Sequence, residues 1–169
     1  MAGRRHESLI PLSHDHREAL GLAFRLHNPV PPGRATPMTP PTTPRGRAEE
    51  TLDFFEQHLR PHFRAEEEHV FPFLEEALGE AHPACDLMAR IRAEHVELRL
   101  LTERLRADLR AGRDLEPTLT AFADLLETHV RSEERELFAS FPDLPAERTA
   151  PLAQAIRKTL GRSRGVSGT

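Results

Sequence analysis

The chain has 169 residues, of which 38% are hydrophobic and 30% are charged, and its formal net charge is −4. This length allows one domain with a buried core. The charge gives no electrostatic basis for binding nucleic acid or an anionic membrane, and no apolar run approaches the roughly 20 residues of a membrane span. The chain has one cysteine, which excludes an internal disulfide, and its N-terminus lacks the apolar core of a secretory signal. We therefore expect a cytoplasmic protein that works without nucleic acid or membrane.

Apolar residues recur at spacings of three and four, which predicts helices, and proline and glycine mark their ends. The first helix is expected to begin near Ser13, after an N-terminal arm of residues 1–11, and to end near Asn28. Further helices are expected at about 48–77, 83–112, 117–140 and, in a shorter form, 149–160. Pro61 lies inside the second of these helices, where it is expected to kink the helix or open one backbone hydrogen bond.

Two segments lack helical periodicity. Residues 28–47 are rich in Pro, Thr, Gly and Arg, which is typical of an extended connector. After the short helix, the last residues of the segment 141–169 are expected to form a disordered tail. No stretch alternates apolar and polar residues as a strand would. The predicted fold is therefore all-α, an up-down-up-down four-helix bundle over residues 12–140 with a short fifth C-terminal helix.

The sequence also contains an internal duplication. The motif His-x-Arg-x-Glu-Glu, with a Phe nine residues after the His, occurs at His62 and again at His129. Asp15-His16 in the first helix resembles Glu94-His95 in the third. The first two helices are separated by the longer connector, and without it the two halves align. We expect a pseudo-two-fold axis in the fold.

Six polar residues occupy positions that the apolar period assigns to the core: His16, His62, Glu66, His95, His129 and Glu133. A single histidine on such a face is usually a hydrogen-bonded core residue. Burying an unpaired carboxylate, however, costs several kcal/mol. Six such residues on four helices indicate a metal centre, which would compensate the carboxylates and use the imidazole lone pairs.

The ligand types restrict the metal. The set contains no cysteine, which disfavours a structural zinc site, and nitrogen with carboxylate suits iron or manganese. Two ions with two bridging carboxylates, four imidazoles and one bridging oxygen would keep roughly two of about twelve coordination positions open for a small ligand. His58, one turn before His62, is expected to be either an additional ligand or a hydrogen-bond partner of one.

One His on each of four helices, with His-x-x-x-Glu on the second and fourth, resembles the hemerythrin-like HHE cation-binding domain. The resemblance covers about residues 12–140 and implies a four-helix bundle around two iron ions. By motif, His16 and His62 would bind one iron, His95 and His129 the other, and the two Glu residues would bridge. The oxygen carriers of the family have a second His where this chain has Arg99, which argues against reversible oxygen carriage.

A ferritin-like di-iron site would need Glu-x-x-His on two helices. Glu66 and His69 supply one such pair, but Glu133 is followed at that spacing by Glu136, so the second is missing. His69 is therefore expected at a boundary or on the surface. Three further acidic residues lie off the core face and are expected to be solvated, as are two duplicated arginines: Glu67, Glu68, Glu134, Arg64 and Arg131.

The leading functional hypothesis is a di-iron protein that binds or reduces dioxygen, peroxide or nitric oxide, with manganese or zinc as alternative metals. Four phenylalanines, Phe55, Phe73, Phe122 and Phe138, are expected to keep water out. The chain has neither Tyr nor Trp, which argues against radical chemistry on organic substrates. The alternatives are an iron- or oxygen-responsive sensing module without turnover and a metal-free structural bundle. The sequence leaves open the electron donor and whether the protein is an enzyme, and we expect a monomer or weak homodimer.

Overall fold

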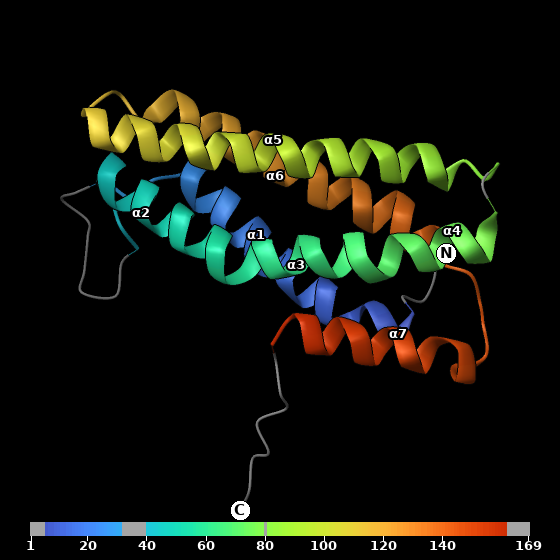
Figure 1. Ribbon diagram of the computed structural model, residues 1–169. Helices are drawn as coiled ribbons and strands as arrows, with labels where there is room; N and C mark the ends of the chain where they lie inside the picture. The colour runs from blue at the N-terminus through green and yellow to red at the C-terminus, as the bar shows by residue number, and fades with distance from the viewer. Residues whose placement is uncertain (1–5, 32–39, 80, 162–169) are drawn as a thin grey trace, which may run out of the picture.

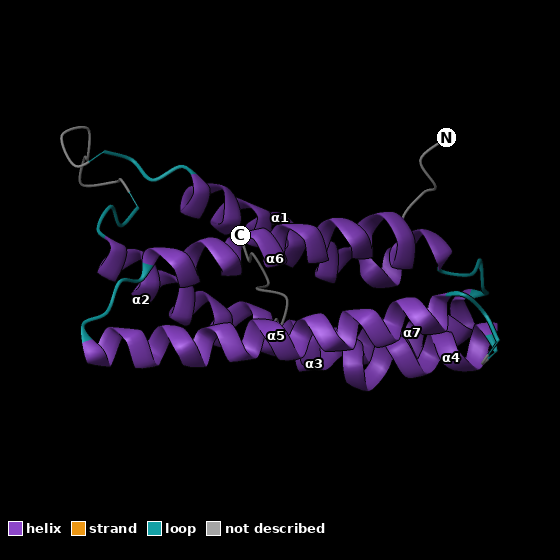
Figure 2. Cartoon of the chain, turned by 90° about the horizontal axis from the view of Figure 1, so that it is seen from above, coloured by secondary structure: helices purple, strands orange, loops and turns teal. Residues whose placement is uncertain are grey.

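The computed structural model describes residues 6–31, 40–79 and 81–161. Parts of the predicted arm, connector and tail lie outside these residues. The described chain is all-helical, as predicted, and contains no strand (Figure 2). None of its helices combines the length and apolarity needed to cross a membrane.

Four helical rods lie alongside one another (Figure 1). The first is α1 (Ile10–His27), preceded by the 3-10 turn η1 (Glu7–Leu9). The second is built from α2 (Pro44–Phe54), η3 (Phe55–Leu59), α3 (Arg60–Ala65), η4 (Glu66–Val70) and α4 (Phe71–Leu78). The third is α5 (Ala84–Ala111), and the fourth is built from α6 (Glu116–Ser132), η5 (Glu133–Leu137) and the 3-10 turn η6 (Phe138–Ser140). The rods contact one another chiefly through α1 with α6, α5 with α6, and α2 with α5.

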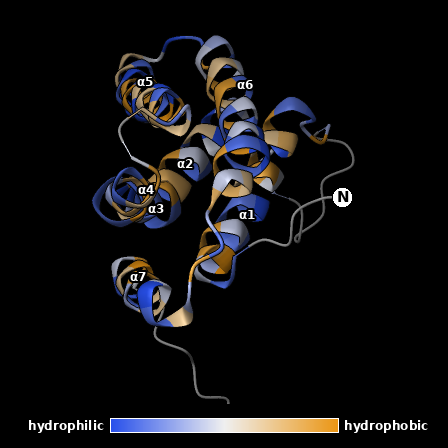
Figure 3. Cartoon of the chain, turned by 90° about the vertical axis from the view of Figure 1, so that its right-hand side faces the viewer, coloured by the Kyte–Doolittle hydropathy of each residue, from blue (hydrophilic) through white to orange (hydrophobic). Residues whose placement is uncertain are grey.

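A further helix, α7 (Ala146–Thr159), lies outside the four rods (Figure 3). It packs against η1, α3 and η4. Its buried residues are Thr149, Leu152 and Ile156. The Ser8 hydroxyl also donates to the Thr149 carbonyl at 3.3 Å.

The helix ends mostly follow the proline and glycine signals. Pro83 caps α5 and Gly112 ends it with a φ of 62°, a left-handed conformation that favours glycine. The predicted start of the first helix was wrong. It begins at Ile10, because Pro11 is compatible with the first turn of a helix, and Ser13 lies buried inside it.

Three segments, η3, η4 and η5, are π-helical turns. The first closes with the Arg60 amide donating to the Phe55 carbonyl, one residue before Pro61, and the second ends likewise before Pro72. Proline removes a backbone donor and crowds the carbonyl four residues earlier, which a wider turn relieves. The expected disturbance at Pro61 is therefore present, as a π turn.

The core consists of two apolar clusters. One contains Leu22, Leu59, Leu98 and Leu126, and the other, at the α4 and α7 end, contains Leu12, Leu74, Ile91 and Leu137. Along every rod, the predicted histidines and glutamates fall between residues of the first cluster and residues of the second. The fold therefore places a polar layer between two apolar ones.

Candidate metal centre

The structure brings the six predicted residues together in this polar layer. α1 supplies His16, α5 supplies His95, and the second and fourth rods each supply one His and one Glu. Their exposed fractions lie between 0% and 3%: His16, His62, Glu66, His95, His129 and Glu133. Both glutamates stand at the first residue of a π turn, a distortion that often occurs at functional sites.

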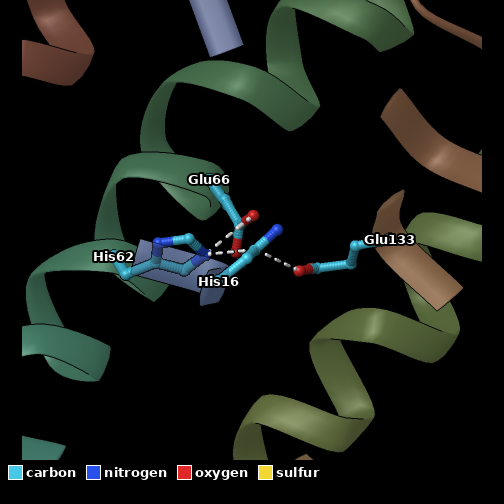
Figure 4. Close-up of side chains that lie close together, drawn as sticks. All are labelled: His16, His62, Glu66 and Glu133. Atoms are coloured by element: carbon cyan, nitrogen blue, oxygen red, sulfur yellow. Dashed lines mark hydrogen bonds and ion pairs between the residues drawn. The ribbon is translucent and has the colours of Figure 1, made fainter. Parts of the chain in front are cut away.

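The imidazole Nε2 atoms point towards the two carboxylates. His16 Nε2 lies 3.0 Å from Glu133 Oε2 and 3.0 Å from His62 Nε2. His62 Nε2 lies 3.3 Å from Glu66 Oε1, and His95 Nε2 lies 3.4 Å from Glu66 Oε2. His129 Nε2 lies 3.5 Å from Glu133 Oε2. Figure 4 shows the convergence of His16, His62, Glu66 and Glu133.

These donors form two overlapping groups, each with ligand atoms within 4.8 Å of one another. The groups are His16, His62, Glu66, Glu133 and Glu66, His95, His129, Glu133. Both carboxylates belong to both groups, and each group has its own pair of histidines. Such an arrangement can hold two cations that share two bridging carboxylates.

Several of these ligand atoms have no hydrogen bond of acceptable geometry. Among the described residues, no oxygen of Glu66 or Glu133 has a hydrogen bond of acceptable geometry, and the same holds for Nε2 of His95 and His129. Buried polar atoms are normally satisfied, and an orphaned carboxylate is especially costly. Cations bound to these oxygen and nitrogen atoms would remove the cost, so the residues fit a metal centre.

A second set of carboxylates holds the other ring nitrogen of each histidine. His16 Nδ1 lies 2.7 Å from Glu134, and His95 Nδ1 lies 2.7 Å from Glu67. His62 Nδ1 lies 3.3 Å from Asp15, and His129 Nδ1 lies 2.9 Å from Glu94. Because an ionised carboxylate only accepts, each Nδ1 donates, which leaves the Nε2 lone pair directed at the centre.

The prediction that Glu67 and Glu134 are solvated was therefore wrong. Each lies one residue beyond an inner glutamate and reaches the histidine of a neighbouring rod. Glu67 also accepts hydrogen bonds from Arg99 at 2.9 and 3.2 Å. The prediction for Glu68 was correct, since its side chain is 52% exposed.

The remaining polar candidates lie away from the centre. His58 is half-buried on the outer face, where its Nδ1 lies 3.3 Å from Glu18 and its ring stacks on Phe54. The π turn η3 contains His58 and changes its angular register relative to His62. His69 lies at a boundary, as expected, 2.8 Å from the Thr159 hydroxyl. Arg64 and Arg131 are exposed.

The aromatic lining differs from the prediction. Phe55, Phe122 and Phe138 are buried, but Phe73 is only half-buried. The π turn η4 adds a residue to the helical turn, so that Phe71 and Leu74 take the inward positions. Phe63, which was not predicted to line the site, stacks its ring on His95 with centroids 3.9 Å apart. Its position beside His62 in a duplicated motif was the available signal.

In the site without a metal, burial and the neighbouring charges have opposite effects on the pKa values of the histidines and of Glu66. Burial would lower the pKa of His62, but the charges of Glu66 and Glu133 and the hydrogen bond to Asp15 outweigh it and raise the pKa to about 10. Burial also lowers the pKa of His16 and His95, but the nearby carboxylates outweigh this effect, so both pKa values are raised. Burial would raise the pKa of Glu66, yet His62 and His95 hold it well below its ordinary value. Without a cation, a proton on His62 offsets part of the buried carboxylate charge.

Replacing Glu67 with glutamine is expected to weaken metal binding, because a neutral amide oxygen is a weaker acceptor than the carboxylate that now orients His95 through its Nδ1. Partners of this type typically contribute about 10- to 100-fold in metal affinity. Competition with a chromogenic chelator would measure the change. Glu68→Gln, one residue later and exposed, is the matched control and should bind metal as the parent does. Equal affinities for all three proteins would contradict a role for Glu67.

Comparison with known proteins agrees with this geometry. Residues 9–141 match the family model described as the hemerythrin HHE cation binding domain. No curated protein and no solved structure matches the chain significantly. The matched range includes the six residues of the centre, here called the inner residues. It also includes the four carboxylates that accept from the histidine Nδ1 atoms, here called the outer carboxylates: Asp15, Glu67, Glu94 and Glu134.

Proposed function

The chain belongs to the hemerythrin HHE cation-binding family, and we propose that it is a non-haem di-iron protein that binds or reduces dioxygen, peroxide or nitric oxide. The observation that carries the proposal is the pair of four-residue groups that share Glu66 and Glu133. Two groups with shared carboxylates favour a dinuclear centre over a single ion. Within the proposal, the four rods form the up-down-up-down bundle expected for the family, with α7 as the added fifth helix.

The donor set favours iron. Each group offers two imidazoles and two carboxylates, and the one cysteine, Cys85, lies elsewhere, with its Sγ 3.6 Å from the Gly79 carbonyl. Imidazole and carboxylate together suit iron or manganese, whereas thiolates would favour a structural zinc site. Ferrous iron could also supply electrons to a bound small ligand.

The protein residues have separate tasks in this proposal. His16 and His62 would hold one ion, His95 and His129 would hold the other, and both ions would share Glu66 and Glu133. The outer carboxylates keep the Nδ1 protons in place, so that each Nε2 stays free to coordinate. Burial of the whole layer excludes water. Arg99 stands where a fifth histidine would be needed, and its guanidinium pairs with Glu67, which favours a four-histidine centre.

Metal analysis with spectroscopy tests the proposal. Protein loaded anaerobically with ferrous iron and desalted is expected to retain about two irons per chain, one for each group of the shared-carboxylate pair. Exposure to air should produce a ligand-to-metal charge-transfer band. Consumption of many equivalents of peroxide or nitric oxide per centre, with an added reductant to resupply electrons, would establish turnover. Less than one iron per chain and no band would contradict the proposal.

A sensing module is the second candidate, and one observation favours it. The six inner residues come from four separate rods, so a bound metal would tie the rods together. Metal-coupled changes in stability can then act as a signal without turnover. A protein that binds iron, changes stability on binding and consumes no excess ligand would support this candidate over the catalytic one.

A further inference from the structure

A pocket of about 720 Å³ lies beside the metal centre, between η1, η6 and α7. Its walls combine aromatic residues with small ones, including Phe138, Phe141, Ala150 and Ala153. Charges of both signs stand around it, a positive one on Arg157 and negative ones on Glu7 and Asp143. A pocket with this lining suits small, uncharged molecules better than ions of one sign.

Phe138 separates this pocket from the centre. It lines the pocket, and its ring also stacks on His16, with centroids 5.2 Å apart and planes inclined by 19°. Only 5% of Phe138 is exposed. His16 itself is 3% exposed, and the other inner residues are no more exposed. A ligand from solvent must therefore pass a side chain, and on this face that side chain is Phe138.

The equivalent phenylalanine of the duplicated half, Phe71, lies outside this pocket. Phe71 follows His62 at the same spacing as Phe138 follows His129. Its ring faces His95, with centroids 6.1 Å apart. Phe71 is fully buried, and the Arg92 guanidinium lies 4.8 Å from its ring centroid. Phe71 does not line the pocket. The two equivalent phenylalanines thus have different surroundings.

The far wall of the pocket comes from α7, which follows the range matched by the family model. The residues of α7 that line it include Thr149, Ala150, Ala153 and Arg157. Two alanines in this wall leave the space that larger residues would fill. Within the matched range only Phe138, Ala139 and Phe141 line the pocket, and its other lining residues lie before or after that range.

We propose that this pocket is the entrance through which a small neutral ligand reaches the metal centre, with Phe138 as the side chain that admits it. The inference rests on the proposed function, since it concerns access to the same centre. Rotation of the Phe138 ring away from His16 opens the path, and the ring must return to exclude water again. Side-chain and lid motions of this kind limit rates in many buried sites.

The rate of nitric oxide association with the reduced, iron-loaded protein tests the proposal. Phe138→Ala is expected to raise the association rate constant about tenfold, because ring rotation no longer limits entry. Phe71→Ala removes the equivalent buried ring, which does not line the pocket, and its rate should stay within about twofold of the parent if access limits association. Equal rate increases in both variants, or no increase in Phe138→Ala, would overturn the proposal.

A metal-free measurement separates this inference from the proposed function. Dissolved dioxygen is paramagnetic, and it should broaden the ring-proton resonances of His16 more than those of His95 in the metal-free protein. Ala153→Trp fills the pocket and should abolish the difference, and Ala150→Phe replaces it if the first variant does not fold. A protein that retains no iron after anaerobic loading but still shows the difference would remove the di-iron function and keep the entrance. Equal broadening at both histidines would overturn the entrance, whatever the metal content.

Discussion

Replacing Glu133 with alanine is expected to abolish metal binding at both positions of the centre. Glu133 belongs to both ligand groups, and its carboxylate lies 3.0 Å from His16 Nε2 and 3.9 Å from His95 Nε2. Loss of a bridging carboxylate removes one ligand from each ion and one negative charge between them. The loss in affinity should exceed the roughly 100-fold upper range for residues that only orient a ligand. Metal content after desalting, with chelator competition, would measure it.

The control for this variant lies in the same π turn. Glu136 is half-exposed and pairs with Arg90 and the Ser132 hydroxyl, so Glu136→Ala should retain the metal content of the parent. Circular dichroism would show that both variants remain helical. A Glu133→Ala protein that keeps two metals per chain would remove Glu133 from the centre and, with it, the dinuclear arrangement proposed above.

The inner residues could be predicted because the helix period alone identifies them. His62 and Glu66, like His129 and Glu133, are four residues apart, and residues at this spacing share a helix face. They fall on faces otherwise occupied by Leu and Phe. Four helices with such faces have only one interior, so their polar residues must meet there.

The outer carboxylates could not be identified in the same way. Glu67 and Glu134 lie off the core face of their own rods, and a single-helix period assigns such positions to solvent. Their partners, His95 and His16, belong to neighbouring rods. Contacts of this kind depend on how two rods are placed against each other. The duplicated Asp15-His16 and Glu94-His95 pairs and the two Glu-Glu pairs were visible in the sequence, but nothing local linked them.

The π turns limited the prediction of the second rod. A constant helix period carries the inward face from Val70 to Phe73, whereas the observed π turn η4 moves it to Phe71 and Leu74. Pro72, next to this turn, was a usable signal. The position of Phe138 at the pocket could not be predicted for another reason. The pocket is completed by α7, and the helix period does not show where α7 packs.

Removing the metal is expected to lower the melting temperature substantially. In the metal-free protein the carboxylates of Glu66 and Glu133 remain buried without acceptable hydrogen bonds. A ligand present at 1,000 times its dissociation constant stabilises the folded state by about 4 kcal/mol. For a chain of this size each kcal/mol corresponds to roughly 2–4 °C. The loaded protein should therefore melt about 10 °C above the metal-free one at neutral pH.

The difference should widen as the pH rises. In the metal-free protein the pKa of His62 is raised from 6.5 to about 10. Its proton therefore stabilises the fold fully below pH 6.5, and this contribution is lost as the pH rises towards 10. The pKa of His16 and His95 is raised in the same direction. In the loaded protein the coordinating Nε2 atoms carry no proton, so a rise in pH removes no stabilising proton from them. Protons also compete less with the metal as the pH increases.

Melting curves of both forms between pH 6.5 and 9 would test this expectation. The metal-free curve should fall with pH, while the loaded curve stays level or rises. His62→Gln supplies the control, because it removes the imidazole whose pKa is raised to about 10, and its metal-free curve should be flatter than that of the parent. A constant difference between the two forms across this range would show that protons do not replace the metal in the polar layer. The buried carboxylates would then need another source of compensation.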